Sequence, residues 1–376
     1  MSTPHVKTCS LVLLFLSCFH ISAQEQNASA GFKVEEVVTD LTFPWSVAFL
    51  SNNQMLVTER GGTLRHVVNK TVSKPIAGIP DDLYVKGQGG LLDVVLHPQY
   101  RQNGWIYLSY SSGTDSNNTL KVIRAKLRDN QLVEKQDIFE VLPYRDTPVH
   151  YGAKMVFIED NSLLITSGDG FDYREDAQRD NNQMGKILRV LDDGSIPLDN
   201  PYIGETEKNL SAAVFTKGHR NPQGLVYDLN RNKVFSHEHG PAGGDEINII
   251  KMGKNYGWPI ITYGKDYSGA TISPFKSYPG MEQPLVDWTP SVAPSGMAVY
   301  YGSLFPQMRG DLLVSTLKTK EILWIKMRGD KVVEQQSLFA DLGYRFRDIK
   351  VHPDGSLYLL VDSAEGKILR VTPQIN

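Results

Sequence analysis

The chain has only two cysteines, Cys9 and Cys18, and both lie close to its N-terminus. The remaining residues therefore cannot form a disulfide or a cysteine-ligated metal site. Beyond residue 23 no apolar run approaches the roughly 20 residues that a membrane-spanning helix needs. Charge of one sign is also not in excess, with 39 basic and 42 acidic residues. This balance gives no electrostatic reason to expect binding to nucleic acid or to an anionic membrane.

The first 23 residues have the pattern of a secretory signal peptide. Lys7 precedes an apolar stretch over residues 11–19, and the segment ends in the small residue Ala23. We therefore expect a cleaved signal at 1–23, a mature domain over 24–376 and a periplasmic or secreted location. The residues before Cys18 match a lipid-attachment motif poorly, so a lipidated N-terminus is the less favoured alternative.

Apolar and polar residues alternate with period 2 along the chain, and no long stretch carries a helical stripe. A unit made of a small-residue entry, an apolar strand, a polar turn and a second apolar strand recurs six times. The six pairs of segments are 45–50 with 55–57, 92–98 with 105–108, 154–157 with 163–166, 224–227 with 234–236, 296–300 with 311–314, and 348–355 with 357–360.

Six such units predict an all-β fold, a six-bladed β-propeller with four-stranded antiparallel blades that forms a single domain. A two-sheet sandwich is the structural alternative, but it gives no reason for a sixfold repeat. We expect the N-terminal strand near residues 32–38 to pair with the last blade, which would cover both sheet edges. The sequence does not distinguish a monomer from a homodimer.

Polar residues stand just before the first strand of several repeats. The innermost strand of each propeller blade begins near the central axis, so these residues should converge at one mouth of the channel. The polar entry residues are Gln88, His150, Arg220, Asn221, Arg345 and Arg347. They are expected to form a ring of hydrogen-bond donors that contains a histidine.

The cations expected around this mouth are Arg220, Lys318, Arg345 and Arg347. Arg345 and Arg347 flank Phe346, so in a strand both guanidinium groups face the same side. Four like charges around one cavity are unfavourable unless a multiply charged anion lies among them. The pattern thus predicts an anionic ligand with several carboxylates or phosphates. The alternative is that the arginines pair with rim acids such as Asp341 and Asp348.

His150 is the candidate general base, because an ordinary histidine pKa near 6.5 suits proton abstraction at neutral pH. It occupies a blade entry without a His-Pro turn. Structural roles are expected for His97, His219, His237, His239 and His352.

Oxygen ligands on glycine and proline turns favour Ca²⁺ over a transition metal. Gly240 and Pro241 offer two such carbonyls. A weaker candidate for a structural ion is the stretch 262–269, with Asp266 and the later Glu282. A further acidic group, expected to be a solvated loop, comprises Asp172, Glu175 and Asp176.

Four motifs together resemble the soluble aldose sugar dehydrogenases, relatives of soluble quinoprotein glucose dehydrogenase. They are Gly87-Gln88-Gly89-Gly90-Leu91-Leu92, Gly218-His219-Arg220-Asn221-Pro222-Gln223-Gly224, Glu238-His239-Gly240-Pro241 and Gly253-Lys254-Asn255-Tyr256-Gly257-Trp258-Pro259. The resemblance extends over nearly the whole mature chain, from Leu41 to Val371.

This resemblance implies that pyrroloquinoline quinone (PQQ) lies over the channel mouth. The counterparts of the residues that hold its carboxylates are Lys318, Arg345 and Arg347, and those beside the quinone are Arg220 and Asn221. The resemblance further implies an active-site Ca²⁺ on Gly240 and Pro241, a base at His150, and cofactor or sugar contacts from Gln88 and Asp169. A second Ca²⁺ loop of the family aligns with Thr262, Gly264, Asp266 and Glu282.

The implied reaction is oxidation of an aldose to a lactone. His150 would take the proton of the C1 hydroxyl while the hydride moves to PQQ, and an unidentified acceptor would reoxidise the cofactor. Val149 replaces an acidic residue of the glucose-specific members, so we expect a broad range of aldoses and weak substrate affinity. The alternatives are a calcium-dependent lactonase on the same fold, which would not need the basic residues, and a non-enzymatic extracellular binding propeller.

Overall fold

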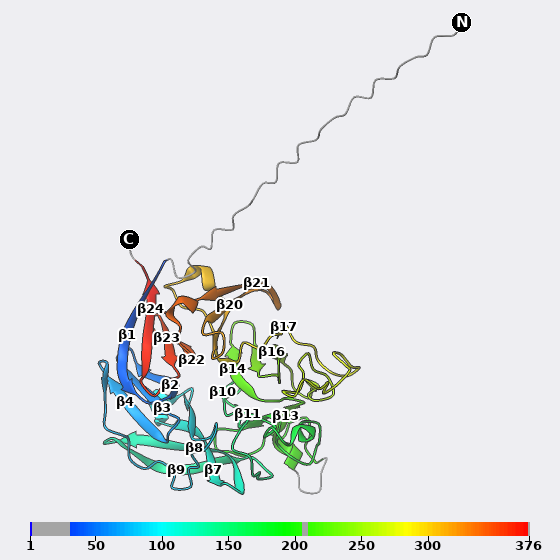
Figure 1. The fold of residues 1–376 in the computed structure, drawn as a ribbon. Helices are drawn as coiled ribbons and strands as arrows, with labels where there is room; N and C mark the ends of the chain where they lie inside the picture. Colours follow the sequence, from blue (N-terminus) through cyan, green and yellow to red (C-terminus); the bar gives the residue numbers. More distant parts are fainter. Residues whose placement is uncertain (2–30, 205–209, 375–376) are drawn as a thin grey trace.

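The computed structural model describes residue 1 and residues 31–204 and 210–374. Beyond Met1, the predicted signal peptide lies outside these residues, as do both cysteines. The described chain forms six four-stranded antiparallel sheets around a central axis, which confirms the predicted propeller (Figure 1).

Each of the first three blades runs from an inner to an outer strand in chain order. Blade 1 comprises β2 (Pro44–Ser51), β3 (Gln54–Glu59), β4 (Thr63–Val68) and β5 (Thr71–Val72). Blade 2 comprises β6 (Leu91–Leu96), β7 (Ile106–Thr114), β8 (Asn117–Arg128) and β9 (Gln131–Glu140). Blade 3 comprises β10 (Met155–Phe157), β11 (Leu163–Ser167), β12 (Lys186–Val190) and β13 (Val214–Lys217).

The last blade is closed by a strand from the start of the chain. Blade 4 comprises β14 (Pro222–Asp228), β15 (Lys233–Glu238), β16 (Asp245–Ile250) and β17 (Val286–Trp288). Blade 5 comprises β18 (Pro294–Val299), β19 (Leu312–Thr316), β20 (Ile322–Arg328) and β21 (Lys331–Leu338). Blade 6 comprises β22 (Phe346–Val351), β23 (Leu357–Val361), β24 (Gly366–Pro373) and β1 (Phe32–Leu41).

The pairing of β1 with β24 confirms the expected closure, and Figure 1 shows the blue first strand beside the red last one. Helical segments are short. They are α1 (Tyr100–Asn103), η1 (Arg174–Ala177), η2 (Leu210–Ala213), η3 (Pro306–Met308) and η4 (Ala340–Leu342). Among the described residues no helix is long and apolar enough to cross a membrane.

The apolar core lies between neighbouring blades. The second strand of a blade is covered on both faces, and all five residues of β11 are buried. The outer strand β9 instead carries a run of four exposed residues, because one of its faces meets solvent. A typical cluster packs Leu92 and Tyr107 of blade 2 against Met155 and Ile165 of blade 3. Neighbouring inner strands contact one another around the axis, and β22 contacts β2 to close the ring.

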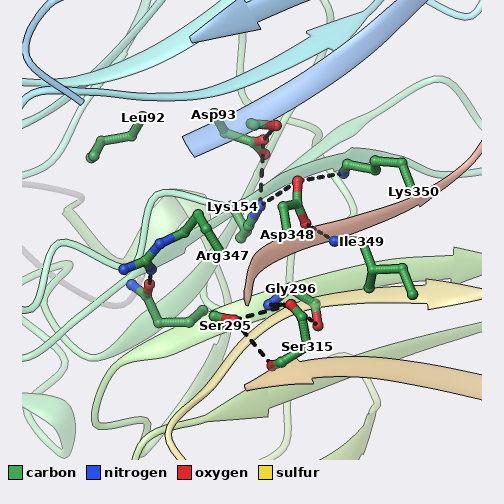
Figure 2. Close-up of polar contacts among 12 residues, drawn as sticks. Leu92, Asp93, Lys154, Ser295, Gly296, Ser315, Arg347, Asp348, Ile349 and Lys350 are labelled. Atoms are coloured by element: carbon green, nitrogen blue, oxygen red, sulfur yellow. Dashed lines mark hydrogen bonds and ion pairs between the residues drawn. The ribbon is translucent and has the colours of Figure 1, made fainter. Parts of the chain in front are cut away.

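Four charged side chains meet where the inner strands of blades 2, 3 and 6 approach one another. Figure 2 shows Lys154 between Asp93 and Asp348, with Lys350 beyond Asp348. The Lys154 ammonium lies 3.3 Å from Asp348 and 3.7 Å from Asp93, and Lys350 lies 3.6 Å from Asp348. We call these four residues the axial ion cluster. Two positive and two negative charges balance within it.

Candidate functional site

A cavity of about 540 Å³ lies at one mouth of the channel. Part of its wall comes from the starts of inner strands and the loops before them, as the entry-residue argument predicts, and the rest comes from residues that follow second strands. Of the residues proposed from the sequence, four line it: Gln88, Asn221, Arg345 and Arg347. Trp45, Tyr151 and Gln223 add further walls from blades 1, 3 and 4.

The cavity is lined by three guanidinium groups and one carboxylate, those of Arg60, Arg345, Arg347 and Asp362. Arg345 lies 3.0 Å from Asp362 and Arg347 lies 3.8 Å from the same oxygen. The Arg347 side chain is 11% exposed, and its buried Nε atom has no hydrogen-bond partner among the described residues. The alternative, pairing of the arginines with rim acids, is found in part, through Asp362 rather than Asp341 or Asp348, and it leaves positive charge in excess. We call Arg60, Arg345 and Arg347 the mouth arginines.

Arg60 and Asp362 were not predicted from the sequence. Each directly follows the second strand of its blade, at the ends of β3 and β23. In an antiparallel pair the end of the second strand lies beside the start of the first, so both positions reach the same mouth. The residue after each second strand was therefore the missing signal.

Lys318 is placed differently from the mouth arginines. The residue that directly follows β19 is Leu317, which lines the cavity, and Lys318 is one residue further along the chain. The Lys318 side chain is exposed and is not part of the lining. Its contact with a cofactor stays a prediction.

His150 and Asp169 form a buried pair beside the cavity. The His150 Nδ1 atom lies 2.7 Å from one carboxylate oxygen of Asp169, which leaves Nε2 for another partner. That carboxylate also accepts hydrogen bonds from the Phe171 amide at 2.9 Å and the Trp258 indole at 2.8 Å. Asp169 is 0% exposed, so the structure places it behind His150 rather than at a surface open to substrate.

The local backbone explains how His150 and Asp169 meet. His150 has a φ of 55°, in the left-handed region that non-glycine residues rarely adopt. Its amide donates to the Gln88 side-chain oxygen at 2.9 Å, which holds this conformation. Gly168 lies so close to the His150 carbonyl that a Cβ atom there would stand 2.0 Å from the oxygen. A glycine is thus required where the two segments cross.

Burial lowers the pKa of His150, although the Asp169 carboxylate acts in the opposite direction. Burial raises the pKa of Asp169, but the hydrogen bond and charge of His150, the charge of Arg220 and the Phe171 amide together lower it below its usual value. At neutral pH the imidazole is therefore neutral and able to accept a proton at Nε2.

The motifs at 218–224 and 238–248 are joined through Glu238. One Glu238 oxygen lies 2.8 Å from His219 Nδ1, and the other accepts a hydrogen bond from the Arg220 amide. The Arg220 guanidinium donates to the carbonyls of His239 and Gly240. These bonds fix Arg220 beside the Gly240-Pro241 turn.

The candidate Ca²⁺ residues are only partly brought together. Gly240 and Pro241 lie beside Arg220, whose guanidinium donates to the Gly240 carbonyl. A carbonyl oxygen has two lone pairs, so the Gly240 oxygen can still accept a second partner. In the second candidate loop, Glu282 pairs with Lys251 and Lys254.

Asp266 instead accepts hydrogen bonds from Ser268 and lies 3.9 Å from Arg174, while the Thr262 hydroxyl accepts from the Gly264 amide. Asp266 and Glu282 thus have separate partners. Over the described ranges no group of three or more His, Cys, Asp or Glu side chains could hold a metal ion.

Comparisons with known proteins identify the family of the chain. Residues 41–370 match the family model described as Glucose / Sorbosone dehydrogenase. The chain is 41% identical over 372 residues to aldose sugar dehydrogenase YliI of Escherichia coli (strain K12). The match covers 97% of this chain and 99% of that protein.

Solved structures give the same result. The apo-form of the soluble aldose sugar dehydrogenase from Escherichia coli superimposes with a TM-score of 0.87 at 40% identity, covering 91% of this chain and 100% of that one. The PQQ-bound form of aldose sugar dehydrogenase from Streptomyces coelicolor gives a TM-score of 0.75 at 26% identity, covering 92% and 99%. The chain therefore belongs to the glucose/sorbosone dehydrogenase family.

Proposed function

We propose that this protein is a quinoprotein dehydrogenase that oxidises the C1 hydroxyl of aldose sugars with PQQ as cofactor. The observation that carries the proposal is the set of three mouth arginines with a single carboxylate, next to a buried histidine–aspartate pair. The relatives named for aldose sugar dehydrogenase activity and the PQQ-bound solved structure support it. Family membership also favours a dehydrogenase over a lactonase or a binding module.

The cavity chemistry fits PQQ, a planar quinone with three carboxylates. Arg345 and Arg347 would hold carboxylates, as the sequence predicts, and Arg60 supplies a third guanidinium in the same lining. The buried, unpartnered Nε of Arg347 is a donor available to such an anion. Asn221 of this lining and its chain neighbour Arg220, which lies outside the lining, would face the quinone oxygens, and Lys318 would add charge from the rim.

His150 would accept the proton of the substrate C1 hydroxyl at its Nε2 atom. Asp169 keeps the Nδ1 side occupied, so it fixes the ring orientation and stabilises the imidazolium that forms. Gln88 would contact the cofactor or the sugar beside His150, because it lines the cavity and its side-chain oxygen accepts a hydrogen bond from the His150 amide. PQQ, when bound, supplies the two-electron acceptor for the hydride.

Ca²⁺ is proposed as a second component on the carbonyls of Gly240 and Pro241. Carbonyl oxygens are ligands that Ca²⁺ prefers, and the anionic cofactor would bring the negative charge that these neutral groups lack. The ion would act as a Lewis acid towards the quinone. The second ion at Thr262, Gly264, Asp266 and Glu282 stays a prediction, as do export to the periplasm, the electron acceptor and the oligomeric state.

Reconstitution tests the proposal. Protein purified without cofactor, then mixed with PQQ and Ca²⁺, should reduce a dye when an aldose is added. His150→Ala should keep PQQ binding and lower turnover by roughly 10²- to 10⁴-fold. His66→Ala, which changes a histidine on β4 remote from the cavity lining, is the matched control and should remain close to wild type. Absence of sugar-dependent reduction would contradict the function, and full activity of His150→Ala would contradict the base.

A further inference from the structure

The loop between β9 and β10 carries a buried guanidinium that the proposed function does not use. Arg145 is 4% exposed. Among the described residues it forms no ion pair, and its Nε and one terminal nitrogen have no hydrogen-bond partner. A buried charge without a partner is strongly unfavourable, and arginine does not lose its proton in proteins. A cation kept in this position therefore requires an explanation.

The main chain of Arg145 fixes the residue beside blade 2. Its amide donates to the Asn118 carbonyl at 2.9 Å, and its carbonyl accepts from the Asn118 amide at 2.8 Å. The Asn118 side-chain oxygen accepts a hydrogen bond from the Tyr151 hydroxyl at 2.6 Å. The Arg145 guanidinium lies over the Tyr151 ring, 4.3 Å from its centroid, which is a cation–π distance. Arg145 is thus held against the residue that directly follows His150.

The same side chain packs against both chain neighbours of Asp169. A terminal nitrogen of Arg145 lies 3.4 Å from the Gly168 carbonyl oxygen. On the other side of Asp169, a Cβ atom at Gly170 would stand 2.9 Å from Cδ of Arg145, so these two segments are in direct contact. Arg145 therefore touches residues next to both members of the His150–Asp169 pair.

The charges around His150 act on its protonation in opposite directions. The Asp169 carboxylate favours the imidazolium, whereas the positive charges of Arg220 and Arg145 disfavour it. Arg145 and Asp169 attract each other. The other titratable groups around Arg145 are the neutral hydroxyls of Tyr151 and Tyr173. The fixed charge of Arg145 thus opposes proton uptake by His150 and favours an ionised Asp169.

We propose that Arg145 is a positioning residue for the His150–Asp169 pair. Its packing fixes the segments that carry both residues, and its positive charge opposes that of the imidazolium, so that the base stays free to accept the substrate proton. Arg145 does not line the cavity, so it acts through its neighbours and not by contact with cofactor or sugar. The inference rests on the proposed role of His150 as the base.

Arg145→Met tests the charge, because it removes the guanidinium and keeps an unbranched apolar stem. Without the positive charge, His150 should protonate more readily, so its pKa should rise by roughly 0.5–1 unit. Histidine NMR of the cofactor-free protein measures this pKa without any turnover. In the reconstituted enzyme, the decline of kcat/KM on the acid side of the pH profile should move to higher pH by the same amount.

Two further variants separate charge from packing. Arg145→Lys keeps the charge but loses the planar group that stacks on Tyr151. Its His150 pKa should stay within about 0.3 unit of the wild-type value, while kcat falls roughly twofold to fivefold with little change in KM. Arg101→Met is the matched control, because Arg101 is exposed on α1, and it should leave both the pKa and the activity unchanged.

An unchanged His150 pKa in folded Arg145→Met would overturn the proposal. An equal shift in Arg145→Met and Arg145→Lys would do so too, because packing alone would then explain it. Arg145→Gln is a second neutral variant that should show the same rise, and failure of both neutral variants to fold would make Arg145 purely structural. If the reconstituted wild type oxidises no sugar, the proposed function fails, whereas the NMR titration still decides whether Arg145 controls His150.

Discussion

The charged side chains in the middle of the channel differ from those at its mouth in how their charges are compensated. In the axial ion cluster two lysines face two aspartates, and Asp93 is further held by the Ser46 hydroxyl at 2.6 Å and the Met155 amide at 2.8 Å. At the mouth the lining holds three arginines and one carboxylate, Asp362, which pairs with Arg345 and Arg347 only.

This difference separates structural charge from functional charge. A buried pair that is balanced within the protein needs no ligand, and losing one member leaves an unpaired charge in a low-dielectric interior. An excess of one sign at a cavity wall is unfavourable until a ligand of the other sign arrives. Substitutions in the axial ion cluster should therefore affect stability, and those at the mouth should affect cofactor binding.

The largest effect is expected from Asp348→Asn. The change leaves Lys154 and Lys350 without their shared carboxylate, so the free energy of unfolding should fall by about 3–5 kcal/mol. Urea unfolding followed by circular dichroism measures it. Asp330→Asn removes an exposed partner of Lys233 and should cost no more than about 1 kcal/mol. Equal effects of both substitutions would refute the structural role of the cluster.

Arg345→Gln should give the opposite result. Removing one of the mouth arginines should weaken PQQ binding roughly tenfold to a hundredfold, because a hydrogen bond to a charged group contributes about 1.5–3 kcal/mol. The free energy of unfolding should change by less than about 1 kcal/mol, because the Arg345 guanidinium is half exposed. Asp362 also retains its ion pair with Arg347 in this variant. Arg60→Gln should act in the same direction, and Lys331→Gln on the outer strand β21 is the control.

Unchanged PQQ affinity in both arginine variants would contradict the claim that the mouth arginines bind the cofactor while the axial ion cluster stabilises the fold. A loss of stability as large as that of Asp348→Asn would do the same.

A smaller effect concerns pH. Because burial lowers the pKa of His150, the neutral base should persist below pH 6.5, and kcat/KM should decline only as pH falls through that lowered pKa. Asp169→Asn removes the carboxylate that favours the protonated imidazole. The decline of kcat/KM on the acid side of its pH profile should therefore move to still lower pH, and turnover should drop. An acid limb at or above pH 6.5 in the wild type would contradict the buried dyad.

The smallest effect is expected at Glu246 on β16, which is paired with Glu238 on the neighbouring strand β15. Burial, and then the charge of Glu238, raises the pKa of Glu246 well above its usual value. A raised carboxyl pKa contributes stability that is complete below the unfolded pKa and is lost as pH rises through the folded value. Glu246→Gln should therefore raise stability by about 1 kcal/mol at neutral pH and have little effect near pH 4.

Thermal unfolding with a chelator present measures the Glu246 effect without added cations. A stabilisation that is equal at both pH values would show that charge is not its cause.

The sequence predicted the blades because their cause is local and repeated. In β22 the apolar residues Ile349 and Val351 alternate with Lys350, and each predicted strand pair is found in its blade. The entry residues Gln88 and Asn221 followed from the same geometry. The sixfold repeat thus fixed both the fold and one ring of the candidate site.

What the sequence did not predict depends on contacts between distant segments. The role of Asp169 behind His150 requires the close crossing at Gly168, which no spacing rule contains. Arg60 directly follows the second strand of its blade, a position that the pattern of polar residues before first strands does not include. Phe171 and Tyr267, whose ring centroids lie 6.1 Å apart, belong to loops outside the repeated strand pairs, so repetition could not indicate their contact.

Titration of PQQ into the cofactor-free protein at low and high salt tests the central claim most directly. The account predicts tight binding that weakens as salt rises and that is largely lost when Arg60, Arg345 and Arg347 are all replaced by glutamine, while the folded protein is retained. PQQ binding that is independent of salt and unchanged in the triple variant would contradict it.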